Sequence, residues 1–148
     1  MTPLLYFAYG SNLDEAQMRA RCPSARLIGV AELANHALCF AGFSPAWGGA
    51  VASITHRPGF YTPGVLYSMS AADMRKLDAF EGHPFVYERT RKRITVASGR
   101  HVYAFTYVHR GGRFSIGPGP KYLRVIERAY KRHGFAKQPL TIAAWGLT

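Results

Sequence analysis

The chain has 148 residues, 48% of them hydrophobic and 14% aromatic, so it can bury a core of ordinary size and is not expected to be disordered. Nineteen Lys and Arg against eight Asp and Glu give a net charge of +11, which suits an anionic partner, either nucleic acid or a small anionic substrate. No apolar run approaches the ~20 residues of a membrane-spanning helix, so we expect no membrane partner.

The N-terminal residues lack the features of a secretory leader. Residues 1–10 carry no basic side chain, and the apolar stretch at residues 4–9 is too short for the hydrophobic segment of a leader. Cys22 and Cys39 are far from a CxxC spacing and have no paired histidines nearby, so we expect reduced thiols and no structural metal. We therefore expect a cytoplasmic protein that folds as a single domain over residues 1–148.

The first elements in chain order are a strand and a helix joined by a tight loop. Residues 4–9 form an apolar run of strand length, which the Gly-Ser-Asn sequence at residues 10–12 interrupts. Residues 13–21 have a helical pattern, and Cys22-Pro23 stops it.

The middle of the chain is rich in Val, Ile, Leu and aromatic residues. Residues 25–40 and 50–56 have strand character, and the Gly-containing residues 42–49 interrupt them. Residues 65–69 are predicted to form another strand.

A helix is predicted from Ser70 to about Glu81. Ser70 and Asp73 have the S-x-x-D spacing of a capping box, in which each side chain accepts a hydrogen bond from a backbone N–H of the first turn. Gly82 followed by Pro84 is typical of a helix end.

The remaining elements are a strand pair and a helix. Residues 86–96 and 101–108 predict a hairpin, and residues 111–120 predict a loop because of their Gly-Pro-Gly-Pro sequence. Residues 121–133 have the apolar spacing of an amphipathic helix that ends at Gly134, and the rest is expected to be a tail. Many strands with few helices among them favour an α+β domain with a curled or barrel-like sheet.

Glu81 is the most informative single residue. At about 100° per residue it lies within roughly 60° of the stripe of Met74, Leu77 and Phe80, so its carboxylate is expected on the core side of the helix. Burial raises the pKa of a carboxyl toward the range in which it can take and return a proton near neutral pH. The alternative is a structural role, in which Glu81 caps a loop or pairs with an arginine such as Arg89.

The Tyr-Gly-Ser-Asn loop at residues 9–12 is the second candidate site. The N-terminus of a helix offers free backbone N–H groups, which can hold a carboxylate or a developing oxyanion. The alternative is a plain N-cap, with Ser11 or Asn12 capping the helix. Ser11 as an acyl-enzyme nucleophile is disfavoured because the G-x-S-x-G sequence is absent.

Two features indicate a nucleic-acid binder instead. Tyr103, Phe105 and Tyr107 alternate along one predicted strand, as in RNA-binding strands, although alternating aromatics are more typical of a core. The basic run at residues 89–93 is more typical of a solvated strand face than of an anion-binding surface.

Four motifs, spaced along residues 6–134, resemble signatures of the γ-glutamylcyclotransferase family and follow the family's order. They are Y-F-A-Y-G-S-N-L at residues 6–13, W-G-G-A-V-A-S-I at 47–54, G-V-L-Y at 64–67 with L-D-A-F-E-G at 77–82, and P-G-P-K-Y at 118–122. The last motif departs from the family's P-S-x-x-Y, with Gly119 in place of serine. Agreement of four separate motifs in one order argues against chance similarity.

The resemblance implies a small mixed β-barrel with a few helices packed around an open pocket. It also implies a reaction without metal or cofactor, in which the α-amine of a γ-glutamyl group attacks its own γ-carbonyl and releases 5-oxoproline and a free amino acid or amine. Glu81 would be the general acid and base. The implied substrate-binding residues are those of the opening strand and loop and the tyrosine after the proline-rich loop, namely Tyr6, Phe7, Ala8, Tyr9, Gly10, Ser11, Asn12 and Tyr122.

Glu88 and Asp78 are the second choices for a catalytic acid, Asp78 being expected as a hydrogen-bonding partner at the helix end. The expected partner is a small-molecule γ-glutamyl substrate, with no nucleic acid, and a homodimer is compatible with the family. The leaving amine stays open, and glutathione is the less expected substrate. The alternative function is a non-enzymatic basic protein that binds RNA or a small anion on the same fold.

Overall fold

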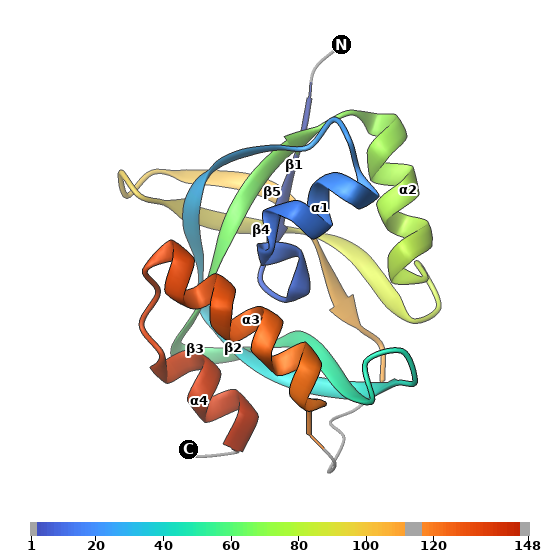
Figure 1. Ribbon diagram of the computed structural model, residues 1–148. Coiled ribbons are helices and arrows are strands. Elements are labelled where there is room, and N and C mark those ends of the chain that lie inside the picture. Colours follow the sequence, from blue (N-terminus) through green and yellow to red (C-terminus); the bar gives the residue numbers. More distant parts are fainter. Residues whose placement is uncertain (1–2, 112–116, 146–148) are drawn as a thin grey trace.

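Five strands close into a barrel in the computed structural model, which describes residues 3–111 and 117–145 (Figure 1). The strands are β1 (Leu4–Ala8), β2 (Arg26–Ser44), β3 (Gly49–Met69), β4 (Tyr87–Val96) and β5 (His101–His109). They are hydrogen-bonded in the order β1-β3-β2-β4-β5, and all pairs are antiparallel except β1 with β5. The predicted α+β fold, a small mixed barrel with helices around it, is confirmed.

β2 and β3 form one long hairpin. The sequence predicts residues 65–69 as a strand of their own, but β3 runs without a break from Gly49 to Met69. Pro63 and Gly64, a pair typical of a break, lie opposite Glu32 and Ala31 of β2 within the ladder. Irregularities in the register along β2 bend the hairpin, which lets the same two strands form much of the barrel wall.

The predicted hairpin of β4 and β5 is confirmed, with its turn at residues 97–100. The two strands pair over their whole length, from Tyr87 opposite His109 to Thr95 opposite His101. Through this hairpin β5 reaches β1, which closes the barrel.

The helix predicted over residues 13–21 is present but begins at Glu15. A single 3-10 turn, η1 (Ser11–Leu13), precedes α1 (Glu15–Arg21), and Asp14 between them is extended. The Asp14 carboxylate caps α1 by accepting from the Ala16 N–H at 3.1 Å. The expectation that Ser11 or Asn12 caps this helix is therefore wrong.

α2 (Ala71–Glu81) begins and ends where the sequence predicts. Ser70 Oγ accepts from the Asp73 N–H at 3.1 Å, and Gly82 ends the helix at a φ of 67°, which favours glycine. The reciprocal half of the capping box is absent, because the Asp73 carboxylate instead accepts from the Ser24 N–H at 2.7 Å. Asp73 thus ties α2 to the segment before β2.

Two helices follow the barrel. α3 (Pro120–His133) confirms the amphipathic helix, whereas the residues predicted as a tail form α4 (Gln138–Trp145), which packs on β2 and β3 with Leu140 buried. α4 is mostly apolar, so its sequence has little of the polar contrast that reveals helical periodicity. Residues 112–116 of the predicted loop lie outside the described part of the chain.

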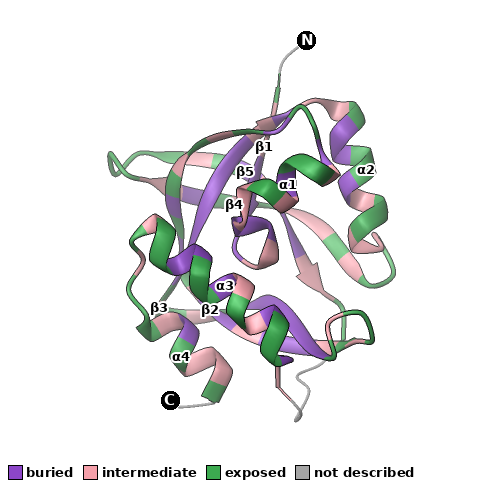
Figure 2. Ribbon diagram, in the orientation of Figure 1, coloured by how far each residue is buried: buried purple, intermediate pink, exposed green. Residues whose placement is uncertain are grey.

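One cluster of buried side chains joins the barrel to its helices. Figure 2 marks the buried residues in purple along the strands and on the helices. Met18 of α1, Leu77 of α2 and Ile126 of α3 are fully buried in it. Phe80, predicted on the apolar face of α2, is instead 58% exposed. No helix in the described part of the chain is long and apolar enough to cross a membrane.

Candidate functional site

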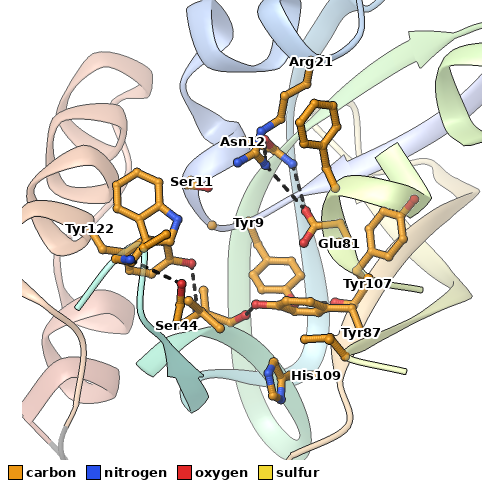
Figure 3. A pocket seen from close by; sticks show the side chains of 18 of the residues that line it. Tyr9, Ser11, Asn12, Arg21, Ser44, Glu81, Tyr87, Tyr107, His109 and Tyr122 are labelled. Atoms are coloured by element: carbon orange, nitrogen blue, oxygen red, sulfur yellow. Dashed lines mark hydrogen bonds and ion pairs between the residues drawn. The ribbon is translucent and has the colours of Figure 1, made fainter. Parts of the chain in front are cut away.

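A cavity of about 350 Å³ opens where the loop after β1 meets the end of α2 (Figure 3). The Tyr-Gly-Ser-Asn loop at residues 9–12 lines it, together with Tyr6, Glu81 and Tyr122. These residues were all predicted as site residues from the sequence. The structure brings them together from β1, η1, α2 and α3.

Phe7 and Ala8, also predicted to bind substrate, do not line the cavity. Both are fully buried, and both lie against β3. The Phe7 ring packs over Gly64, where an added Cβ would meet it at 2.6 Å. Phe7 and Ala8 therefore belong to the buried core beside the cavity, and the Phe7 ring lies 6.4 Å from that of Tyr9, which does line it.

Glu81 is the last residue of α2, and its side chain is only 16% exposed. Its Oε1 accepts from Asn12 Nδ2 at 3.2 Å and lies 4.0 Å from Arg21 Nη1. Burial raises the pKa of Glu81 to about 7, while Arg21 and the Asn12 hydrogen bond oppose that rise. The carboxyl can therefore both take and give a proton near neutral pH.

Arg89, the arginine named as an example of a structural partner for Glu81, pairs with Asp78 instead, and the arginine that faces Glu81 is Arg21. Arg89 Nη1 lies 2.9 Å from Asp78 Oδ2, and the Tyr107 hydroxyl donates to Asp78 Oδ1 at 2.6 Å. Asp78 thus has the hydrogen-bonding role expected of it. Glu88 is 56% exposed at its side chain and pairs with Arg110, away from the cavity.

Buried tyrosines form much of the cavity wall. Burial raises the pKa of each well above its usual value, so their hydroxyls are neutral at physiological pH. The Tyr9 hydroxyl donates to the Tyr107 carbonyl oxygen, and the Tyr87 hydroxyl donates to the Ala52 carbonyl oxygen at 2.7 Å. These bonds hold the rings against the barrel.

Tyr122 is held by contacts with β3 and with the turn that precedes β3. Its hydroxyl accepts from the Ala52 N–H at 2.8 Å, which leaves the hydroxyl proton available to a bound group. Its ring lies edge-on to Trp47, with centroids 5.0 Å apart. A Cβ at Gly119 would clash with the Trp47 carbonyl oxygen, so glycine in place of the family's serine suits this close approach.

The backbone of the Tyr-Gly-Ser-Asn loop presents N–H groups at the start of η1. The first bond of the turn runs from the Leu13 N–H to the Gly10 carbonyl at 3.0 Å. The N–H groups of Gly10, Ser11 and Asn12 precede that bond and are not used by the turn. The Asn12 carbonyl accepts from the Tyr67 hydroxyl at 2.8 Å, which ties the loop to β3.

Sequence reasoning did not identify Arg21, Tyr87 or His109 as site residues, although all three line the cavity. Arg21 lies four residues after Gln17 on the helix that follows the loop, and this spacing is the signal that could have indicated it. His109 stacks edge-on with Tyr87 and its Nδ1 accepts from the Gly111 N–H, while burial lowers its pKa. The spacing of residues in the sequence does not predict that His109, at the end of β5, lines this cavity.

The aromatic residues considered for RNA binding do not form one exposed row. Tyr107 is buried at the cavity, whereas Tyr103 is 61% exposed. Arg91 lies over Tyr103 and Arg89 over Phe105, so the basic run packs on these rings. Among residues 3–111 and 117–145, no group of three or more His, Cys, Asp or Glu side chains is placed to hold a metal ion.

Comparison with known proteins gives a consistent result. Residues 6–127 match the protein family described as Gamma-glutamyl cyclotransferase, AIG2-like. The protein named Gamma-glutamylcyclotransferase from Mus musculus is 32% identical over 139 residues, which cover 90% of this chain and 73% of the relative. Its counterpart from Homo sapiens is 31% identical over 135 residues, which cover 88% of this chain and 71% of the relative.

Comparison of the fold with solved structures points to the same family. A solved structure named Gamma-glutamyl cyclotransferase superimposes with a TM-score of 0.86 at 29% identity, over 93% of this chain and 83% of that one. The resemblance inferred from the four sequence motifs is thereby confirmed.

Proposed function

The chain belongs to the Gamma-glutamyl cyclotransferase, AIG2-like family, and we propose that it releases 5-oxoproline and a free amino acid or amine from a small γ-glutamyl substrate. In this reaction the α-amine nitrogen bonds to the γ-carbonyl carbon and closes a five-membered lactam. The bond from that carbon to the leaving nitrogen breaks. The steps need proton transfer but no oxidant or reductant.

Glu81 is the general acid and base of this proposal. The α-ammonium group becomes a nucleophile only after it loses a proton, and Glu81, with a pKa of about 7, can accept it. The same carboxyl then returns a proton to the leaving nitrogen. The observation that carries the proposal is this buried carboxyl in the cavity beside residues 9–12.

The rest of the cavity suits the same reaction. The N–H groups of Gly10, Ser11 and Asn12 can stabilise the developing oxyanion or hold the α-carboxylate of the glutamyl group. The apolar walls of Tyr6, Tyr9 and Tyr122 can hold that group in a ring-closing conformation, which raises the effective concentration of the amine. Phe7 and Ala8 support these walls from the core.

The test is the release of 5-oxoproline from a panel of γ-glutamyl dipeptides and γ-glutamyl amines. Glu81→Gln should keep the fold and lose on the order of 10² or more in kcat. Glu88→Gln is the matched control, because it makes the same change at an exposed carboxylate outside the cavity. Near-normal turnover by Glu81→Gln would reject the role of Glu81, and no release by the wild type from any compound would reject the activity.

The single domain, the cytoplasmic location and the homodimer stay predictions from the sequence. Sedimentation of the purified protein measures the oligomeric state. The panel itself ranks the leaving groups, since each compound shares the glutamyl half and differs in the amine.

A further inference from the structure

The Asn12 side chain is held at both ends of its amide. Its Nδ2 donates to the Tyr6 hydroxyl at 3.0 Å and to Glu81 Oε1 at 3.2 Å. Its Oδ1 accepts from Gln17 Nε2 at 3.1 Å and from Arg21 Nη1 at 3.2 Å. A carboxamide has two N–H donors and two oxygen lone pairs, so all four hydrogen-bonding positions of this 4% exposed residue are used.

Residues of α1 determine which end of the Asn12 amide faces Glu81, because they bind the other end. Gln17 and Arg21 are four residues apart and lie on the same face of the helix. A guanidinium has no acceptor, so only the oxygen end of Asn12 can face Arg21. A reversed amide would place its oxygen against the Glu81 carboxylate and its N–H groups against the Arg21 guanidinium, which can only donate.

We propose that Arg21 and Gln17 are positioning residues that lock the Asn12 amide in the orientation in which it donates to the Glu81 carboxylate. This inference rests on the proposed role of Glu81 and extends it to two residues of α1. Neither residue needs to touch the reacting atoms for this role.

The structure holds both positioning residues in place. The Arg21 guanidinium lies over the Phe80 ring, 5.2 Å from its centroid, and its side chain is 22% exposed. Gln17 Nε2 also donates to Ser11 Oγ at 2.8 Å, which links α1 to the Tyr-Gly-Ser-Asn loop. Phe80 is 58% exposed, so this contact lies at the surface of α2.

Arg21 is also the cation that faces Glu81. The other titratable groups around the cavity are neutral near pH 7, because burial raises the pKa of the tyrosines and lowers that of His109. They come from β1 and its following loop, β4, β5 and α3, and are Tyr6, Tyr9, Tyr87, Tyr107, Tyr122 and His109. On α2 itself, Asp78 is paired with Arg89.

The kinetic test compares the pH dependence of kcat and KM in three variants. Arg21→Met should lower kcat about tenfold at pH 7 and move the acidic limb of the profile up by about one pH unit, so that activity recovers at higher pH. Arg21→Lys should keep the position of that limb but not the full kcat, because an ammonium is a single-point donor. Gln17→Leu should lower kcat by about threefold with little change in KM.

The matched control is Arg19→Met, which removes one cation from an exposed position of the same helix, where Arg19 pairs with Glu15. It should leave kcat, KM and the pH profile unchanged. If Arg21→Met does not fold, Arg21→Lys and Gln17→Leu decide the question. Wild-type kcat in both would overturn the proposal.

A second readout does not depend on activity. NMR titration of the carbon-13-labelled glutamate carboxyls gives the pKa of Glu81, and Glu81→Gln identifies its signal. The midpoint should be higher than in the wild type both in Arg21→Met and in Gln17→Leu. Because Gln17→Leu removes no charge near Glu81, an unchanged midpoint in that folded variant would overturn the proposal. A wild type that releases no 5-oxoproline would reject the proposed function, while this titration still decides the role of Arg21.

Discussion

Two carboxylates one turn apart on α2 have the same kinds of neighbour at very different distances. Each faces an arginine whose guanidinium lies over a phenylalanine ring. Arg89 Nη1 approaches Asp78 to 2.9 Å, and a tyrosine hydroxyl adds a bond of 2.6 Å to that carboxylate. Arg21 Nη1 stays 4.0 Å from Glu81, whose hydrogen bond from Asn12 is 3.2 Å long.

The difference shows how one helix end provides both an anchor and a proton carrier. Short charge-assisted hydrogen bonds make Asp78 a fastening point between α2 and the β4–β5 hairpin. Around Glu81 the favourable contacts are longer, and burial outweighs them, so its pKa rises to about 7. Burial is the largest cause of the raised pKa of Glu81, and Arg21, at 4.0 Å, offsets it only in part.

The largest expected effect is on the pH dependence of stability. The pKa of Glu81 is raised from 4.5 to about 7, so between these values the folded protein holds a proton that the unfolded chain has released. The unfolded state then binds fewer protons, and the free energy of unfolding falls as the pH rises through this window. Relative to Glu81→Gln, the wild type should lose about 3 kcal/mol across it.

Denaturant unfolding of both proteins, from about pH 4 to about pH 8, measures this difference. Parallel pH curves for the two proteins would contradict a buried carboxyl with a raised pKa. Glu88→Gln is again the control, because its exposed side chain should give a curve parallel to that of the wild type.

The next prediction is that substitutions of Asp78 and Glu81 change the free energy of unfolding in opposite directions. Asp78→Asn should lower the free energy of unfolding by about 1–2 kcal/mol, because Arg89 loses its charged partner in a partly exposed pair. At about pH 8, Glu81→Gln should raise it, because the variant no longer buries a charge. Unfolding of both variants in one buffer gives the two signs. Changes of the same sign would contradict the different roles of Asp78 and Glu81.

Activity separates the same two variants in the opposite direction. Asp78→Asn should keep kcat within about threefold of the wild type, whereas Glu81→Gln should lower kcat by on the order of 10² or more. A large kcat loss in a folded Asp78→Asn would mean that Asp78 takes part in the reaction and is not only a structural contact to β4.

The smallest effect concerns the two phenylalanine rings. A cation–π contact at an exposed site contributes about 0.5–1 kcal/mol. Phe80→Leu should therefore loosen Arg21 and lower kcat about two- to fourfold, with little change in thermal stability. Phe105→Leu, under Arg89, should lower stability slightly and leave kcat unchanged. If kcat were the same in both variants, the contact between Phe80 and Arg21 would have no part in positioning the groups around Glu81.

Much of the fold follows from local patterns. The capping residue Ser70, the terminating Gly82 and the apolar spacing of residues 121–133 indicate α2 and α3 closely, because caps and helical periodicity act within one or two turns. The same logic does not find α4, whose apolar sequence has no polar face, or the break at Asp14, where a side-chain cap restarts the helix.

The site shows a similar division. The Tyr-Gly-Ser-Asn loop and Glu81 stand out in the sequence because helix geometry and the scarcity of acids point to them before any contact is known. The opening motif implies that Tyr6, Phe7 and Ala8 all bind substrate, because a matched motif does not show which of its side chains face a cavity. The structure places Phe7 in the core instead.

By itself, the sequence determined the elements that carry the site: the strand before the loop, the helix that ends at Glu81, and the side of that helix on which the carboxyl lies. That Arg21, and not Arg89, faces Glu81, and that Asn12 donates to Glu81, depends on tertiary packing. Asn12 and Glu81 are 69 residues apart, and the contact exists only because the closed barrel brings the end of β1 to the end of α2. Local periodicity extends over a few turns, whereas pKa and amide orientation depend on whatever the whole fold packs around a group.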